Sequence, residues 1–165
     1  ATFPLIAEAR ARGVVLDPAL GMGNFGYAVA KEQADRGLHP DTISSDVTLG
    51  GQKFHSLVEC MAKFMAVGYS FRDVVSMTTG RAAAAIGLAD EIGAIAVGRV
   101  ADLTVLDLVR GDFTFVDTTK TRFSGEYGIV PVHTIRAGEL IAPGWGTHPW
   151  GFLPESAETA GAGAR

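Results

Sequence analysis

Short apolar runs and apolar residues at helical spacing alternate along the first half of the chain. Residues 14–16 form a continuous apolar run bounded by a glycine and an Asp-Pro pair, which predicts a short strand buried on both faces. The loop after it ends at Asn24, which can cap a helix that Gly37 can end. Residues 42–46 are rich in β-branched and small side chains, which predicts a second strand with Asp46 at its C-terminal end.

Two further helices are predicted from capping signals. Ser56 with Glu59, and Ser70 with Asp73, have the spacing of a capping box, in which each side chain accepts a hydrogen bond from the other residue's backbone N–H. Apolar residues at helical spacing follow each pair. We expect the first of these helices to end at Gly68 and the second to continue through an alanine-rich turn.

From Ile92 onward the apolar spacing changes to the alternation typical of strands with one solvated face. The segments expected to form strands are residues 95–97, 101–107, 113–116, 130–135 and 139–141, with a hairpin turn at Ala137-Gly138 before the last of them. The chain therefore reads as α/β in its first half and mostly β in its second, with a boundary near Asp90.

Composition and charge exclude two classes of protein. Charged residues make up 19% of the chain, against about 25% in a typical soluble domain, and the mean hydropathy is +0.22. No apolar run approaches the ~20 residues that a membrane-spanning helix needs, so we expect no membrane-embedded segment. The net charge is -4 and no basic cluster interrupts the mixture of charges, which argues against a nucleic-acid-binding surface.

The single cysteine, Cys60, cannot form an internal disulfide. It lies in the apolar-rich segment 57–67, where we expect a buried structural thiol rather than a nucleophile. A reducing compartment, the cytoplasm, is the expected location.

Asp46 is the strongest candidate for chemistry. Active sites of α/β barrels lie at the C-terminal ends of the parallel strands, which is where the pattern places this carboxylate. An aspartate that bounds a strand can also be a turn former or a helix cap. The residues alone leave both interpretations open.

Several motifs resemble the amidohydrolase superfamily. The stretches GVVLD at 13–17, GMGNF at 21–25 and GLHPDTISSD at 37–46 resemble its last two barrel units, most closely those of deacetylase and dihydroorotase-like metallohydrolases. Residues 77–83 resemble the helix where the family usually reads T-x-N-P-A-x. The run EIGAIAVGRVADLTVLD at 91–107 matches the family's E-I-G-x-(six residues)-A-D-L-x-V-L-D pattern and is the most specific of these motifs.

The resemblance covers roughly residues 13–141 and implies an α/β fold built from part of a TIM (β/α)8 barrel. It assigns residues 1–90 to strands 7 and 8 with their helices, residues 91–145 to a small β-sandwich, and residues 146–165 to a flexible tail. A complete barrel needs about 250 residues. We therefore expect a fragment that requires the N-terminal part of the same enzyme or another copy, and an assembly of identical subunits.

The resemblance also implies a metal site. It gives Asp46 the role of metal ligand and proton shuttle, with one or two divalent ions, expected to be zinc, in a complete barrel. Gly21 and Gly23 serve either a tight turn or a close backbone approach to substrate, and both interpretations stay open. The family's other ligands, an H-x-H pair, a carboxylated lysine or a glutamate, and two further histidines, would precede residue 1. The four histidines of this chain, which lack ligand-like spacing, are His39, His55, His133 and His148.

Three hypotheses follow. The first is a metal-dependent hydrolase that cleaves the C–N amide or ester bond of a small molecule: a cyclic amide, an N-acyl amino acid or an acylated hydroxy acid. The second is a non-catalytic binding or assembly module that has lost the metal, which is favoured by Leu20 at a position where close relatives carry a histidine. The third is an α+β domain unrelated to barrels.

Overall fold

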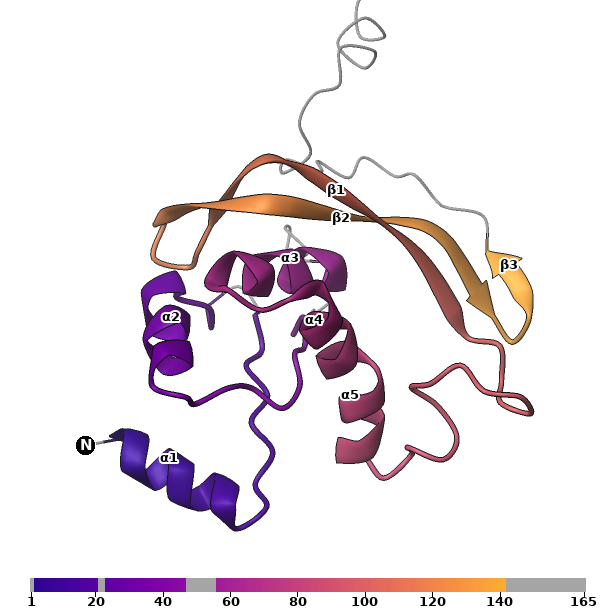
Figure 1. The fold of residues 1–165 in the computed structure, drawn as a ribbon, viewed down its shortest axis with the longest axis horizontal. Coiled ribbons are helices and arrows are strands. Elements are labelled where there is room, and N and C mark those ends of the chain that lie inside the picture. Colours follow the sequence, from indigo (N-terminus) through magenta and orange to yellow (C-terminus); the bar gives the residue numbers. More distant parts are fainter. Residues whose placement is uncertain (1, 21–22, 47–55, 142–165) are drawn as a thin grey trace, which may run out of the picture.

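A computed structural model describes residues 2–20, 23–46 and 56–141 of the 165-residue chain. In these ranges, helices precede a three-stranded antiparallel sheet of order β1-β2-β3 (Figure 1). The elements are α1 (Thr2–Ala11), α2 (Tyr27–Asp35), α3 (Leu57–Val67), α4 (Phe71–Thr78), α5 (Gly80–Ala85), β1 (Leu103–Val116), β2 (Arg122–Arg136) and β3 (Glu139–Ile141). The predicted tail, residues 146–165, lies outside the described residues.

The capping signals predict the starts of α3 and α4 correctly. The Ser56 side chain accepts a hydrogen bond from the Glu59 backbone N–H at 3.2 Å, and α3 ends at Gly68, whose φ of 126° suits glycine. At α4 both halves of the predicted capping box are present, formed by Ser70 and Asp73. Hydrogen bonds from the side chain and backbone of Ser70 hold the pKa of the Asp73 carboxyl below its usual value.

The predicted start of α2 is wrong by two residues. The N-cap is Gly26, with no side-chain capping bond, and the helix begins at Tyr27. Asn24 lies in the turn before it, where its side chain bonds a different part of the chain. Local sequence identified Asn24 as a residue of the capping type, but it did not reveal that the Asn24 amide bonds Asp46 instead of the helix backbone.

The two strands predicted at residues 14–16 and 42–46 do not form regular strands. Both segments are extended, and a single parallel bridge, Ala19 to Ser44, joins them. A strand needs a hydrogen-bonding neighbour along its length, and no other strand of the described ranges pairs with either segment. The positions of the two segments are therefore predicted correctly, but their regularity is not.

The sheet confirms the hairpin signal at its end. Residues 137 and 138 both have positive φ, 50° and 85°, which is typical of a two-residue hairpin turn, and β3 follows immediately. The strand predicted at residues 95–97 is wrong: this segment has no strand pairing, and Ile95 and Val97 are 90% and 106% exposed. The exposure explains the error, because alternating apolar residues favour a strand only where one side of that strand packs against other residues.

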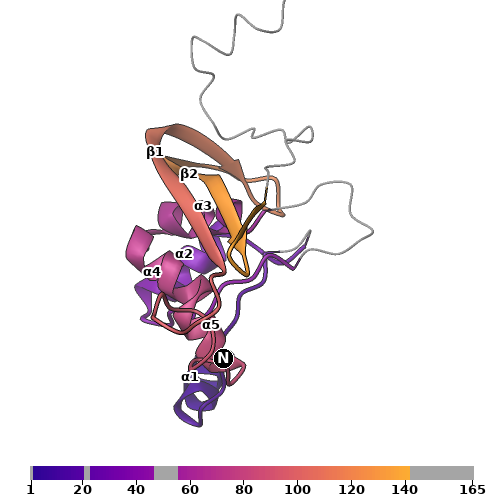
Figure 2. The same cartoon turned by 90° about the vertical axis from the view of Figure 1, so that its right-hand side faces the viewer.

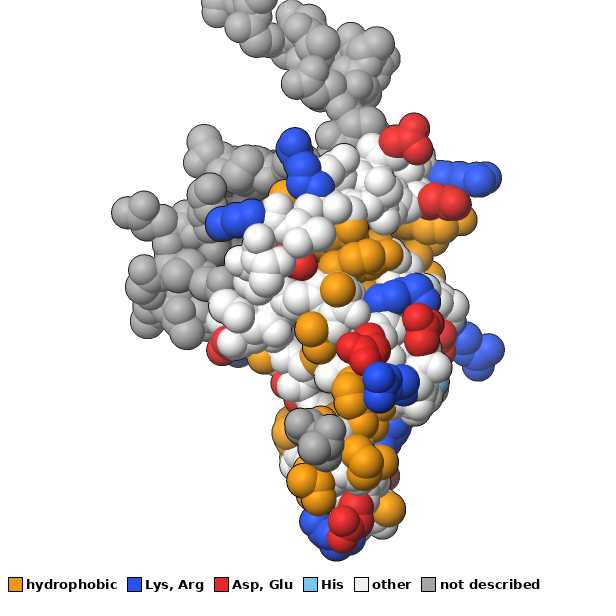
Figure 3. All heavy atoms as spheres, turned by 90° about the vertical axis from the view of Figure 1, so that its left-hand side faces the viewer, with side chains coloured by type: hydrophobic (Ala, Val, Ile, Leu, Met, Phe, Trp, Pro, Cys, Tyr) orange, Lys and Arg blue, Asp and Glu red, His pale blue; other side chains and the backbone are white. Residues whose placement is uncertain are grey.

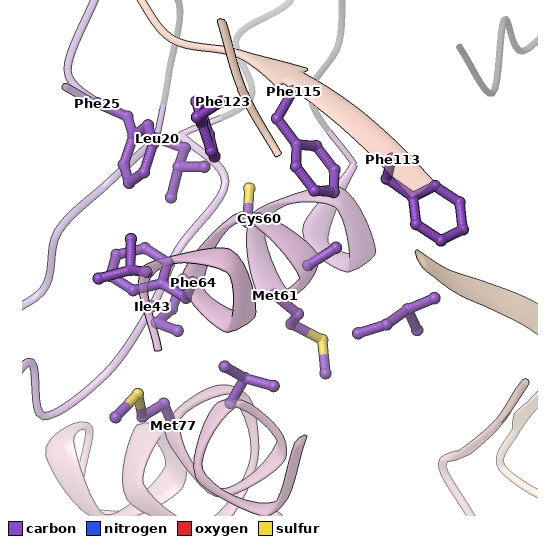
Figure 4. Packing of buried hydrophobic residues seen from close by; sticks show 14 residues of the cluster. Leu20, Phe25, Ile43, Cys60, Met61, Phe64, Met77, Phe113, Phe115 and Phe123 are labelled. Atoms are coloured by element: carbon purple, nitrogen blue, oxygen red, sulfur yellow. The ribbon is translucent and has the colours of Figure 1, made fainter. Parts of the chain in front are cut away.

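One hydrophobic core joins the helices to the sheet. Helix α3 lies beneath the sheet, and its Cys60, Met61 and Phe64 belong to a cluster of buried residues that also come from the sheet, α4 and the two extended segments (Figures 1, 2 and 4). The other members of the cluster are Leu20, Phe25, Ile43, Ala62, Val67, Val74, Met77, Phe113, Phe115, Phe123 and Ile129. Cys60 is fully buried, as predicted, and burial, assisted by the Glu59 charge, raises the pKa of its thiol to about 12.

Close packing of β2 on the phenylalanines of β1 requires glycine at two positions. A Cβ at Gly125 would lie 2.7 Å from Phe115, and one at Gly128 would lie 2.8 Å from Phe113. Both phenylalanines are therefore fixed between the sheet and α3, which holds the helical layer in place under the sheet.

Candidate active site

The candidate site is built on the two extended segments that the Ala19 to Ser44 bridge joins. The Asp17 carboxylate links them, because it accepts hydrogen bonds from Thr42 Oγ1 at 2.7 Å and from Ser44 Oγ at 2.6 Å. The Leu20 backbone N–H donates to the Ser44 carbonyl at 3.1 Å. These bonds hold the two segments side by side and parallel, so that both end at the same edge.

The opposite end of this pair is fixed by Asp41. Its Oδ2 accepts a hydrogen bond from the Leu16 backbone N–H at 2.9 Å. Its Oδ1 accepts from the Arg10 guanidinium at 2.7 Å, and Arg10 also donates to the His39 carbonyl. Helix α1 is thereby tied to the segment that leads to Asp46.

Asp46 lies at the C-terminal end of the second segment. Its φ is 50°, a left-handed conformation that is uncommon for residues other than glycine, although aspartate adopts it more readily than most. Its Oδ2 accepts a hydrogen bond from Asn24 Nδ2 at 2.9 Å, and both residues are exposed. The predicted candidate therefore has a defined carboxylate orientation and an accessible position.

The glycine-rich loop is described only in part. Gly21 lies outside the described residues. Gly23 is exposed, has no positive φ, and a Cβ placed on it would meet no atom within 4 Å. The described backbone therefore places no steric demand for glycine at position 23, and the choice between a tight turn and a close approach to substrate stays a prediction.

A cavity of about 310 Å³ lies beside the first segment, between α1 and α2. Its lining is mostly apolar, with Asp17, Asn24, Gln33 and Tyr69 as polar contributors. Asp46 does not line it. Asn24 thus borders both this cavity and the candidate carboxylate.

The described residues supply one candidate metal ligand. They hold no group of three or more His, Cys, Asp or Glu side chains that could bind an ion. His39 bonds the Tyr69 hydroxyl through Nδ1 at 3.1 Å, and His133 lies exposed in β2. His55 and His148 fall outside the described ranges. The exposed carboxylate of Asp46 could supply one oxygen ligand to the implied metal, and the described residues group no further ligands with it.

The described surface carries a mixture of charged and apolar side chains. On the face that Figure 3 shows, acidic and basic side chains are interspersed with apolar ones, including those of α1. Within the part of the chain that the structure describes, no helix has both the length and the apolar character required to cross a bilayer.

Comparison with known proteins decides the family. A sequence profile of the Amidohydrolase family matches residues 25–141, a range that includes Asp46 and the whole sheet. The chain belongs to the amidohydrolase family. The resemblance predicted from sequence is confirmed, and the interpretation as an unrelated α+β domain is wrong.

Individual relatives agree with this assignment. The amidohydrolase chain is 29% identical over 147 residues to a deacetylase of Brucella anthropi, and 31% identical over 147 residues to a deacetylase of Agrobacterium fabrum. Each alignment covers 84% of this chain and 36% of the relative. The chain thus spans about a third of the length of these relatives.

Two solved structures, an adenine deaminase and a dihydroorotase, have a similar fold. An adenine deaminase superposes with a TM-score of 0.77 at 25% identity, and a dihydroorotase with a TM-score of 0.71 at 30% identity. Each match covers 82% of this amidohydrolase chain and 38% of the other chain.

The long-range hydrogen bonds of the Asn24 and Asp17 side chains are not evident from local sequence. The Asp-Pro pair at 17–18 marks the end of the apolar run, and a carboxylate there signals only a turn. Its bonds to Thr42 and Ser44 depend on a neighbour 25 residues away or more. The bond from Asn24 to Asp46 likewise crosses between two loops, which no local pattern reveals.

Proposed function

We propose that the protein is a metal-dependent amidohydrolase in which Asp46 is both a metal ligand and the group that carries the proton. The observation that supports this most is the placement of Asp46. It ends an extended segment that lies parallel to its neighbour, in a left-handed conformation, within the stretch that matches the family. A carboxylate in that place faces the edge where barrel enzymes bind substrate.

In this proposal the two extended segments are the last two strands of a (β/α)8 barrel. Apart from their bridge to each other, neither segment pairs with a strand of the described ranges, and the chain covers 36% of the relatives' length. The remaining strands and metal ligands would come from the N-terminal part of the same enzyme or from another copy. Residues 91–145 would then contribute strands to a small β-sandwich, separate from the barrel portion at 1–90.

The chemistry assigned to Asp46 follows from its two oxygens. Asp46 would hold a divalent ion, zinc in our proposal and present once or twice per site, which would supply Lewis-acid polarisation of the scissile carbonyl and a water of lowered pKa, ~7. One oxygen of Asp46 would hold the ion, while the carboxylate accepts the proton of the attacking water and returns it to the leaving group. Gly21 and Gly23 would let the loop backbone approach the substrate.

The proposed substrate is a small molecule with a C–N amide or ester bond: a cyclic amide, an N-acyl amino acid or an acylated hydroxy acid. Support comes from the relatives named deacetylase and from the structural neighbour named dihydroorotase. We also propose that the enzyme is located in the cytoplasm and that it assembles from identical subunits.

Substitution of Asp46 tests this function. In the complete enzyme, Asp46→Asn keeps the shape and the hydrogen bond from Asn24 Nδ2 but removes the charge and the proton acceptor. We expect kcat for amide or ester hydrolysis to fall about 10²–10⁴-fold. The matched control is Asp112→Asn, an exposed aspartate in the irregular part of β1, which should retain the activity of the wild type. Equal kcat in the two variants would contradict the proposed role.

One observation favours the second candidate, a binding module without metal. Leu20, at the position where the family resemblance leads us to expect a histidine, is 1% exposed and belongs to the hydrophobic core. Such a residue cannot contact a polar substrate in this conformation. Absence of bound metal in the purified complete protein, with intact folding, would favour this candidate over the hydrolase.

A further inference from the structure

We propose that Asn24 is a positioning residue for Asp46: its amide holds the carboxylate in the orientation that the reaction requires. This inference rests on the proposed function and assigns a role to a residue outside the metal-ligand set. It begins from one contact, the hydrogen bond of 2.9 Å from Asn24 Nδ2 to Asp46 Oδ2.

The direction of this bond is determined by the chemistry of its partners. An ionised carboxylate only accepts hydrogen bonds, so the NH₂ end of the Asn24 amide must face Asp46. The contact joins residues 22 positions apart, one in the loop after the first extended segment and one at the end of the second. Asn24 therefore links the ends of the two extended segments at the edge where the candidate site lies.

Capping of the next helix does not account for Asn24. Helix α2 begins at Tyr27 after Gly26 and has no side-chain cap, so Asn24 does not serve the helix start. Both Asn24 and Asp46 are exposed, and water competes with a hydrogen bond between two exposed side chains. Such a bond adds little to folding, but it restricts the rotation of the carboxylate.

Restricted rotation has a consequence for the two oxygens. Asn24 occupies Oδ2, while no donor among the described residues bonds Oδ1. The uncharged amide leaves the full negative charge on Asp46, whereas a lysine or arginine there would neutralise it. In this proposal Oδ1 is the oxygen that faces the metal ion, and the backbone of Asp46 has a φ of 50°.

Two variants of the complete enzyme test this role. Asn24→Leu keeps nearly the same shape without the donor, and Asn24→Ala removes the side chain. We expect both to weaken zinc binding, measured by competition with a chelator, by about 10–100-fold, as the loss of an outer-shell partner typically does. In kinetics we expect kcat to fall and KM to stay close to that of the wild type, because the substrate contacts are unchanged.

The matched control separates positioning from folding. Ser70→Ala removes the cap of α4, away from the two extended segments, and should lower Tm while zinc affinity stays at the wild-type value. The Asn24 variants should show the reverse: a wild-type Tm and weaker zinc binding. If they bind zinc as tightly as the wild type, or if zinc affinity falls only in proportion to Tm as in an unstable protein, the inference is overturned.

The outcomes also separate this inference from the proposed function. A wild-type enzyme that binds no zinc and hydrolyses no amide or ester contradicts the proposed function itself. A wild-type enzyme that binds zinc and is active, with Asn24 variants that match it in both zinc affinity and kcat, contradicts only the role of Asn24.

Discussion

At the scale of single residues, Asp117 makes the most connections of any carboxylate described in this chain. It is 7% exposed and follows β1. Its Oδ2 accepts from the Tyr27 backbone N–H at 3.0 Å, and its Oδ1 accepts from the backbone N–H groups of Thr119 and Thr121, each at 2.9 Å. One side chain thus fixes both the β1-β2 turn and the start of α2, next to the loop that carries Asn24.

Loss of this carboxylate should destabilise the fold. We expect Asp117→Ala to lower the free energy of unfolding by about 1–3 kcal/mol, because three backbone donors in partly buried hydrogen bonds lose their acceptor. Urea unfolding at neutral pH measures this value. A change indistinguishable from zero would show that water replaces the carboxylate at no cost.

The same residue should make stability depend on acid pH. Burial acts to raise the pKa of Asp117, but hydrogen bonds from Thr119, Tyr27 and Thr121 outweigh it and hold the pKa below the ordinary value of 3.8. A lowered folded-state pKa gives stability that is present above the unfolded-state pKa and is lost as pH falls through the folded-state pKa. Between pH 5 and pH 2 the wild type should therefore lose more stability than Asp117→Ala.

At the scale of elements, α3 carries a buried ion pair in its core-facing surface. Lys63 Nζ lies 2.8 Å from Glu59 Oε1, and the two side chains are 4% and 20% exposed. A lysine this deeply buried keeps its charge at low cost only beside a carboxylate. The pair therefore lets α3 carry a buried lysine among its apolar residues.

Breaking the pair from its two sides should give unequal results. Glu59→Gln leaves the Lys63 ammonium buried without a counter-charge and should cost about 1–3 kcal/mol of stability. Lys63→Met replaces the buried charge by an apolar side chain of similar length and leaves the partly solvated Glu59, so its cost should be smaller. Thermal unfolding of both variants compares them, and a larger loss for Lys63→Met would contradict this account of the pair.

The elements also show how far sequence alone can predict this fold. Helices α3 and α4 and the final hairpin were predictable because Ser56, Ser70 and Gly138 act through neighbours a few residues away. The segments 14–16 and 42–46 were located correctly, but whether they become strands depends on partners distant in sequence. For the same reason Asp46 was identified as a candidate from its position, while the role of its neighbour Asn24 was not.

At the scale of the whole molecule, the described residues leave the candidate site around Asp46 open to solvent. One core unites α3 with the sheet, and the two extended segments end together at one edge with Asp46. Apolar side chains remain exposed, including Val14 and Val15 on the first segment. In our proposal the rest of the barrel covers these residues and brings the remaining metal ligands to Asp46.

The most direct test of this account is the metal content of the complete enzyme, measured by elemental mass spectrometry after equilibration with zinc and removal of unbound ions. The account predicts one or two ions per site in the wild type and in the Asp112→Asn control, and a clear loss of bound zinc in Asp46→Asn with folding unchanged by circular dichroism. Equal zinc content in the wild type and in Asp46→Asn, or none in either, would contradict the assignment of Asp46 as a metal ligand.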